Sequence, residues 1–113
     1  MVVSMDFNTQ SCPWSDYTVI AVMSQDNMSS CRIYIYPDEP HVAVISDLYV
    51  DEKVRGQGRA TELLDYCAEI VKPLKCTEIQ LRSDTDDWVR QWYLRKGFEV
   101  ISSQVWLRKN LKY

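Results

Sequence analysis

The residues most suggestive of chemistry lie in a glycine-containing segment, VRGQGRAT, at residues 54–61. Two glycines separated by one residue, Gly56 and Gly58, let the backbone turn tightly and point successive N–H groups outward. An amphipathic helical pattern begins directly behind them, so the positive end of a helix dipole would add to those N–H groups. The segment therefore predicts a site for phosphate groups.

Other interpretations of the two glycines can be compared with the sequence. A P-loop needs the string Gly-x-x-x-x-Gly-Lys followed by Ser or Thr, and the chain contains no such string. A dinucleotide-binding fingerprint needs a third glycine where Thr61 stands, and 113 residues are too few for the parallel strands and crossovers of that fold. A turn that merely joins a strand to a helix stays open on the glycines alone.

The residues around the glycines make the motif more specific. RGQGRA at residues 55–60 resembles the Arg/Gln-x-x-Gly-x-Gly/Ala loop of the GCN5-related N-acetyltransferases (GNAT family), and DLYV at residues 47–50 precedes it at that family's spacing. Downstream, WYLRKGF at residues 92–98 resembles a helix end of the same family, where a tyrosine precedes a Gly-Phe pair. Both motifs stand in the family's order, and the resemblance spans roughly residues 41–109.

The resemblance implies an enzyme that transfers an acetyl group from acetyl-coenzyme A to a primary amine by direct attack. The pantetheine arm would pair with the strand end at residues 48–50, where a free N–H could stabilise the oxyanion. The loop and the helix N-terminus would hold the diphosphate, with Arg55 and Arg59 as charge partners. The cofactor-binding residues so implied are Leu48, Tyr49, Val50, Arg55, Gly56, Gln57, Gly58, Arg59, Ala60 and Thr61.

Two side chains are candidates for catalytic proton transfer. Tyr93, with an ordinary pKa near 10, could donate a proton to a departing thiolate whose ordinary pKa is about 8.5. Its alternative is a core role, since residues 88–93 form an aromatic stripe at helical spacing. Asp47 is our candidate base, because an ionisable group in an apolar central strand is costly unless it is paired or working. Three alternatives stay open: a proton relay through water to Asp47, His41 as the base, or no dedicated base.

The charge pattern indicates the class of partner. Acidic clusters at residues 38–39, 51–52 and 84–87 predict a cationic amine acceptor, and the net charge of −3 disfavours a nucleic-acid surface. Asp86 stands where the family commonly has an asparagine that touches the cofactor arm. The same loop would also suit a non-catalytic coenzyme A sensor or a protein-interaction module, and the identity of the acceptor stays open.

The elements that must position these residues follow from periodicity and turn residues. Apolar positions from Ala60 recur at i, i+3, i+4 and i+7 until Pro73 and predict a helix, and Gly97 is expected to end a second one. The order β-β-β-α-β-α-β-β predicts an α/β fold with a mixed, largely antiparallel sheet, GNAT-like but abbreviated at the N-terminus. The strands are expected at 17–23, 31–36, 41–50, 76–83, 98–101 and 105–107, and the second helix has candidate caps at 83–85.

Length and composition limit the alternatives. A chain of 113 residues predicts one domain, residues 1–113, and its 46% hydrophobic content is that of a globular protein. We expect a cytoplasmic protein without a membrane segment, because no apolar run approaches the length of a span. Cysteines 12, 31, 67 and 76 lack zinc spacing, which predicts reduced thiols and no metal site. A monomer or a homodimer fits the exposed edges of a small sheet.

Overall fold

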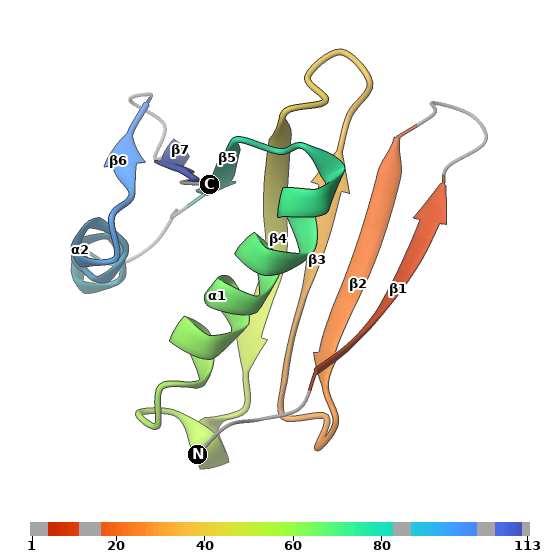
Figure 1. The fold of residues 1–113 in the computed structure, drawn as a ribbon. Coiled ribbons are helices and arrows are strands. Elements are labelled where there is room, and N and C mark those ends of the chain that lie inside the picture. Colours follow the sequence, from red (N-terminus) through yellow and green to blue (C-terminus); the bar gives the residue numbers. More distant parts are fainter. Residues whose placement is uncertain (1–4, 12–16, 83–86, 102–105, 112–113) are drawn as a thin grey trace.

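The computed structural model describes residues 5–11, 17–82, 87–101 and 106–111. In these residues the strands form one mixed sheet in the order β1-β2-β3-β4-β5-β7-β6, with helix α1 lying across β3 and β4 (Figure 1). The mixed α/β fold predicted from the sequence is thus confirmed. The strands are β1 (Met5–Ser11), β2 (Thr18–Ser24), β3 (Ser29–Ile35), β4 (Val42–Val50), β5 (Glu78–Arg82), β6 (Glu99–Val100) and β7 (Trp106–Asn110). The helices are α1 (Arg59–Val71), α2 (Asp87–Arg95) and the short 3-10 turns η1 (Glu52–Val54) and η2 (Lys72–Leu74).

Strand β1 is an element that the sequence did not predict. It pairs antiparallel with β2 along its whole length, from Met5 opposite Ser24 to Ser11 opposite Thr18. Its sequence, MDFNTQS, is mostly polar and shows little hydrophobic alternation. An edge strand is held by backbone hydrogen bonds to its neighbour, so its side chains carry a weak pattern.

Strand β4 is the centre of the sheet and pairs differently along its two halves. Residues 42–45 pair in parallel with residues 78–81 of β5, and no described residue of β5 pairs with residues 46–50. On its other side β4 pairs antiparallel with β3 as far as Val50, with a shift of register between Ser30 and Arg32. Within the described residues, the pairing of β4 with β5 therefore ends at Ile45.

Burial along β4 differs between the two halves of the strand. Its first residues, Val42, Ala43 and Ile45, are buried, whereas residues 46–50 are half-buried or exposed. The bulge lies in this second half, where Asp47 has a φ of +56°. The apolar run in the sequence therefore describes a buried first half followed by a half-covered strand end.

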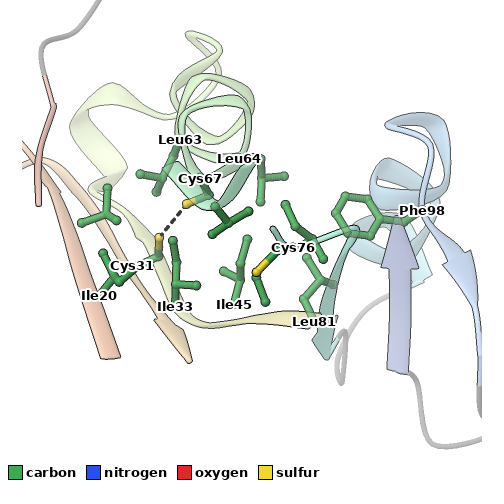
Figure 2. Close-up of a cluster of buried hydrophobic side chains, with 14 of the residues drawn as sticks. Ile20, Cys31, Ile33, Ile45, Leu63, Leu64, Cys67, Cys76, Leu81 and Phe98 are labelled. Carbon is green, nitrogen blue, oxygen red and sulfur yellow. Dashed lines mark hydrogen bonds between the residues drawn. The ribbon is translucent and has the colours of Figure 1, made fainter. Parts of the chain in front are cut away.

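The core lies between α1 and one face of the sheet (Figure 2). Leu63 and Cys67 of α1 are fully buried against β-strand residues that include Ile33. The Sγ atoms of Cys31 and Cys67 are 3.4 Å apart, and both are free thiols. Burying side chains of this kind stabilises a fold by roughly 1.5–3 kcal/mol each. This packing fixes the line of α1 and hence the place of its N-terminus.

The helix ends agree with the residues expected to form them. Pro73 lies in η2, which extends α1 by one tighter turn until Lys75 adopts a φ of +66°. Gly97 follows α2 with a φ of +96°, as the left-handed terminator that was predicted. The candidate caps at 83–85, the predicted turn at 102–103, Asp86 and Cys12 lie outside the described residues.

Among the described residues, no helix is long and apolar enough to cross a membrane. Within the same residues, no group of three or more His, Cys, Asp and Glu side chains is arranged to hold a metal ion.

Candidate functional site

A groove of about 480 Å³ joins the end of β4, the glycine loop, the start of α1 and one side of α2. It brings together segments about forty residues apart in sequence, since residues 48–50 and residues of α2 between 88 and 93 both line it. Most of the residues implied as cofactor-binding line it, and so does Tyr93; Gln57 is exposed and lies outside the lining. The lining residues are Leu48, Tyr49, Val50, Arg55, Gly56, Gly58, Arg59, Ala60, Thr61, Trp88, Val89, Trp92 and Tyr93.

The glycine loop has the backbone geometry of an anion-binding turn. Gly56 and Gly58 have φ values of +78° and +80°, a region that other residues enter only with strain. An added Cβ at either position would meet no atom within 4 Å, so the space in front of the loop is open. The conformation itself, rather than crowding, is what requires glycine at these positions.

The N-terminus of α1 opens onto this space. Gly58 is the N-cap residue and makes no side-chain capping bond, while its carbonyl oxygen accepts the N–H of Glu62 at 3.0 Å. The first N–H groups of any helix lack partners within the helix, and a glycine cap cannot satisfy them. Arg59, Ala60 and Thr61 therefore present backbone donors at the positive end of a thirteen-residue helix dipole.

The two loop arginines have different surroundings. Arg55 is exposed, lines the groove and donates from Nε to the carbonyl oxygen of Val50 at 2.9 Å. Arg59 has only 8% of its side chain exposed, because its guanidinium forms a two-pronged ion pair with Asp26 at 2.6 and 3.2 Å. That guanidinium already has a carboxylate partner, so Arg55 is the freer of the two predicted charge partners.

The ion pair also fixes the charge state of Asp26. The Arg59 guanidinium first, and then hydrogen bonds from Ser24 and the N–H of Met28, hold the pKa of Asp26 well below its usual range. The same partner raises the pKa of Arg59. Asp26 is therefore ionised at every pH above strong acid, and the pair persists throughout the neutral range.

Among the described residues, the strand end at residues 48–50 has a strand neighbour on one side alone, and the carbonyl oxygen of Val50 accepts the Nε of Arg55. Tyr49 and Val50 pair with Ser30 and Ser29 of β3 on one side. On the other side the described part of β5 has already ended its pairing at Ile45. A strand edge of this kind can take up an extended ligand through alternating N–H and C=O groups.

Tyr93 meets the packing expectation and also lines the groove. It is 7% exposed and makes an edge-to-face contact with Phe98, with ring centroids 5.6 Å apart and planes at 71°. Burial raises the pKa of its phenol above the ordinary value, because the ionised form loses solvation. The hydroxyl is therefore held in the protonated state that a proton donor needs.

Asp47 lies in surroundings other than those expected. The burial argument for it is wrong, because 63% of its side chain is exposed and its carboxylate lies 3.5 Å from Nη1 of Arg32. It lines a second groove, of about 620 Å³, that includes Met23 and Asn27 and does not include Tyr93. Leu48 lines the first groove and the preceding residue Asp47 lines the second, because successive residues of a strand face opposite sides of the sheet. His41 is exposed just before β4, at the end of the strand away from the loop.

The structure adds a groove residue that the sequence analysis had assigned only to an aromatic stripe. Trp88 is 69% exposed and lines the groove together with Trp92. Its spacing of four residues from Trp92 places the two indoles on one side of α2, whereas Tyr93 and Phe98 pack in the core. Two tryptophans four residues apart in one short helix were the available signal in the sequence.

Comparison with solved structures shows the same fold in acetyltransferases. An acetyltransferase of the GNAT family from Staphylococcus aureus Mu50 superposes with a TM-score of 0.69 at 15% identity, covering 85% of this chain and 68% of that one. An acetyltransferase from Bacillus cereus gives 0.65 at 19% identity, covering 97% and 77%. A GNAT family acetyltransferase from Elizabethkingia anophelis with acetyl-CoA bound gives 0.66 at 12% identity, covering 96% and 99%.

Sequence comparison gives the family. No curated protein matches the chain by sequence. The model of the acetyltransferase (GNAT) family matches residues 4–98, a span that runs from the first strand through both motifs. That span contains the glycine loop, the strand end and Tyr93, which the groove brings together. The chain belongs to the GNAT acetyltransferase family.

Proposed function

We propose that this protein is an N-acetyltransferase that moves an acetyl group from acetyl-CoA to a primary amine by direct attack. The observation that carries the proposal is the groove in which a glycine loop, a helix N-terminus, Tyr93 and a strand end that the described part of β5 does not pair come together. The bound acetyl-CoA of the Elizabethkingia anophelis acetyltransferase supports a donor of this type. Family members in general transfer acyl groups from acetyl-CoA, so the donor follows from the family. The acceptor must be inferred from the residues of this chain.

The groove suits the two chemically different halves of such a donor. The loop N–H groups from Gly56 onward and the first turn of α1 would bind the diphosphate, with Arg55 adding charge. The backbone at residues 48–50 would pair with the amide-containing arm as an added strand. An N–H of that strand end would also stabilise the charge that develops on the carbonyl oxygen during attack. The open space before Gly56 and Gly58 is the room that the diphosphate would need.

Tyr93 would supply the proton to the leaving sulfur. Its raised pKa keeps the phenol protonated at neutral pH, and it lies in the same groove as the strand end. The half-buried Trp92 and the buried Phe98 contact its ring and limit its motion, so that its hydroxyl is held on a fixed helix. General acid catalysis needs this combination of a protonated group and a fixed position.

Asp47 would receive the amine from the second groove. Its side chain lines the second groove, and its chain neighbour Leu48 begins the strand end proposed to bind the donor. An exposed carboxylate attracts an ammonium group and can accept its proton directly or through water. The acceptor is therefore proposed to be a cationic primary amine.

The function is tested by thiol release with acetyl-CoA across amines of different charge. Steady release that requires an amine, with N-acetylated product found by mass spectrometry, is the expected result. Tight coenzyme A binding without release for any amine would instead show a non-catalytic sensor. Absence of both binding and release would remove the proposal altogether.

The phosphate-binding role of the loop predicts the effect of Gly58→Val. A β-branched residue cannot hold a φ of +80° without strain, so the loop N–H groups should turn away from their common target. We expect affinity for coenzyme A, measured by calorimetry, to fall about tenfold or more. Gly97→Val is the matched control, because Gly97 also has a positive φ of +96° but lies outside the groove. Equal losses in both variants would reduce the effect to general destabilisation.

Tyr93→Phe separates proton donation from packing. Loss of the hydroxyl alone should lower kcat about a hundredfold while coenzyme A affinity changes little. A purely packing tyrosine would keep near-wild-type kcat at a saturating amine, which is the contrary outcome.

The raised pKa of Tyr93 also predicts how the free energy of unfolding depends on pH. Because the native pKa lies above the ordinary value near 10, the unfolded chain ionises first, and stability should fall as pH rises beyond about 10. Chemical unfolding of wild type and Tyr93→Phe from neutral pH to values above about 10 checks this, since the variant should lack this contribution to the alkaline decline.

The exposure of Trp88 predicts that it covers the bound donor. Trp88→Ala should weaken coenzyme A binding about fivefold, and Trp88→Phe should restore most of the affinity by keeping an aromatic face. Leu74→Ala is the control, because Leu74 is 47% exposed and lies in η2, away from the groove. Unchanged affinity in Trp88→Ala would leave this indole without a role in binding.

The proposed role of Asp47 predicts selectivity among acceptors. Asp47→Asn should raise KM for a cationic amine several-fold and leave KM for a neutral amine nearly unchanged, while added salt should raise the wild-type KM. Glu69→Gln is the charge-matched control, because Glu69 is exposed on α1 and pairs only with Lys72 at 3.1 Å among the described contacts. Equal turnover of neutral and cationic acceptors at low salt would contradict this acceptor class.

A further inference from the structure

The turn between β2 and β3 holds a carboxylate that the proposed mechanism does not use. Asp26 accepts hydrogen bonds at its Oδ1 from the hydroxyl of Ser24 at 2.6 Å and from the N–H of Met28 at 3.0 Å. The guanidinium of Arg59 binds both of its oxygens. Ser24 itself is 1% exposed and also accepts the N–H groups of Met28 and Ser29. Asp26 is therefore held in one orientation by a built hydrogen-bond network.

Arg59 connects this network to the groove. It is the first residue of α1 and directly follows Gly58, the second glycine of the loop. Its partner lies thirty-three residues earlier in the chain, in a different element. Figure 1 shows the β2–β3 turn and the start of α1 at the same end of the sheet. The ion pair thus ties the far end of the glycine loop to the turn.

The near end of the loop is tied to the same turn. The N–H of Asp51, the first residue after β4, donates to the carbonyl oxygen of Met28 at 2.7 Å. Between Asp51 and Arg59 lie η1 and both loop glycines. The segment that would bind the diphosphate is therefore held at both ends by residues 26–28, and its interior depends on glycine conformations that are intrinsically permissive.

We propose that Asp26 is a positioning residue for the cofactor: by holding Arg59, it sets the N-terminus of α1 and the glycine loop in the geometry that binds the diphosphate. This inference rests on the proposed binding of acetyl-CoA in the groove. Preorganised N–H donors bind an anion without the entropy cost of ordering the loop, which is how a residue outside the contact surface can raise affinity. Arg59 then acts through its backbone, because its side chain is occupied by Asp26.

Electrostatics alone predicts that removing the charge of Asp26 would raise, not lower, the affinity for coenzyme A. Asp26 carries a negative charge close to a site for an anion, and removing it would strengthen the attraction of the site for a phosphate group. Freeing the Arg59 guanidinium would strengthen it further. A loss of affinity on neutralising Asp26 is therefore a result that positioning explains and that simple charge does not.

The test uses Asp26→Asn in the full chain, with calorimetric binding of coenzyme A and kinetics on two donors. We expect the affinity for coenzyme A to fall about tenfold. With acetyl-CoA, KM should rise by a similar factor with little change in kcat. With S-acetylpantetheine, which lacks the diphosphate, KM should change less than twofold relative to wild type. A general loss of structure would affect both donors alike.

Two further variants complete the test. Glu52→Gln, an exposed residue of η1, makes the same change of charge near the loop without touching the network, and its affinity should stay at or slightly above that of wild type. Arg59→Lys keeps the positive charge but loses the two-pronged geometry, and it should weaken coenzyme A binding as Asp26→Asn does. If Asp26→Asn does not fold, Arg59→Lys alone decides the question by the same two-donor comparison.

The outcomes separate this inference from the proposed function. Unchanged or tighter binding of coenzyme A in folded Asp26→Asn would overturn the positioning role while leaving the function intact. Equal KM increases for both donors would overturn it as well, by showing a general defect. Failure of the wild type to bind coenzyme A would overturn the proposed function, and this inference with it.

Discussion

The backbone of β4 imposes the constraint on which the site depends. Its first half satisfies its N–H and C=O groups against β3 and β5, and this pairing places the strand in the middle of the sheet. After Ile45 no described residue of β5 continues the ladder, while β3 continues to Val50. Backbone polar groups need partners, and an edge that keeps only one neighbour is prepared to accept another. The groove of this protein has such an edge as one of its walls.

The second constraint is the placement of α1. Leu63 and Cys67 are fully buried against the sheet, so the helix axis cannot slide without opening the core. Its N-terminus therefore points at a fixed place beside the β4 end, where Gly58 leaves the first N–H groups without a side-chain cap. Hydrophobic packing therefore sets the position of the helix N-terminus. The glycine at the N-cap leaves the N–H groups there free of a side-chain cap, so the positive end of the helix dipole can act on a ligand.

Much of the site follows from local patterns. The glycine pair has the positive φ values of a tight turn, the amphipathic stripe behind it forms α1, and Gly97 ends α2, because backbone conformation and helix periodicity are properties of neighbouring residues. The polar strand β1 was missed because pairing at a sheet edge leaves little trace in side-chain type. Asp47 was misjudged because a bulge with a φ of +56° turns a residue of an apolar run to the surface.

By itself the sequence determined the family resemblance, the order of most elements and the segment that forms the loop, since these depend on residue types at short spacing. Only the tertiary structure decided that Asp26 occupies Arg59, that Trp88 faces the groove and that Asp47 borders a second groove. Each of these depends on contacts or exposure created when distant segments pack together. Charge and aromatic character can be read from a sequence. Which partner a side chain contacts depends on how the strands and helices pack together.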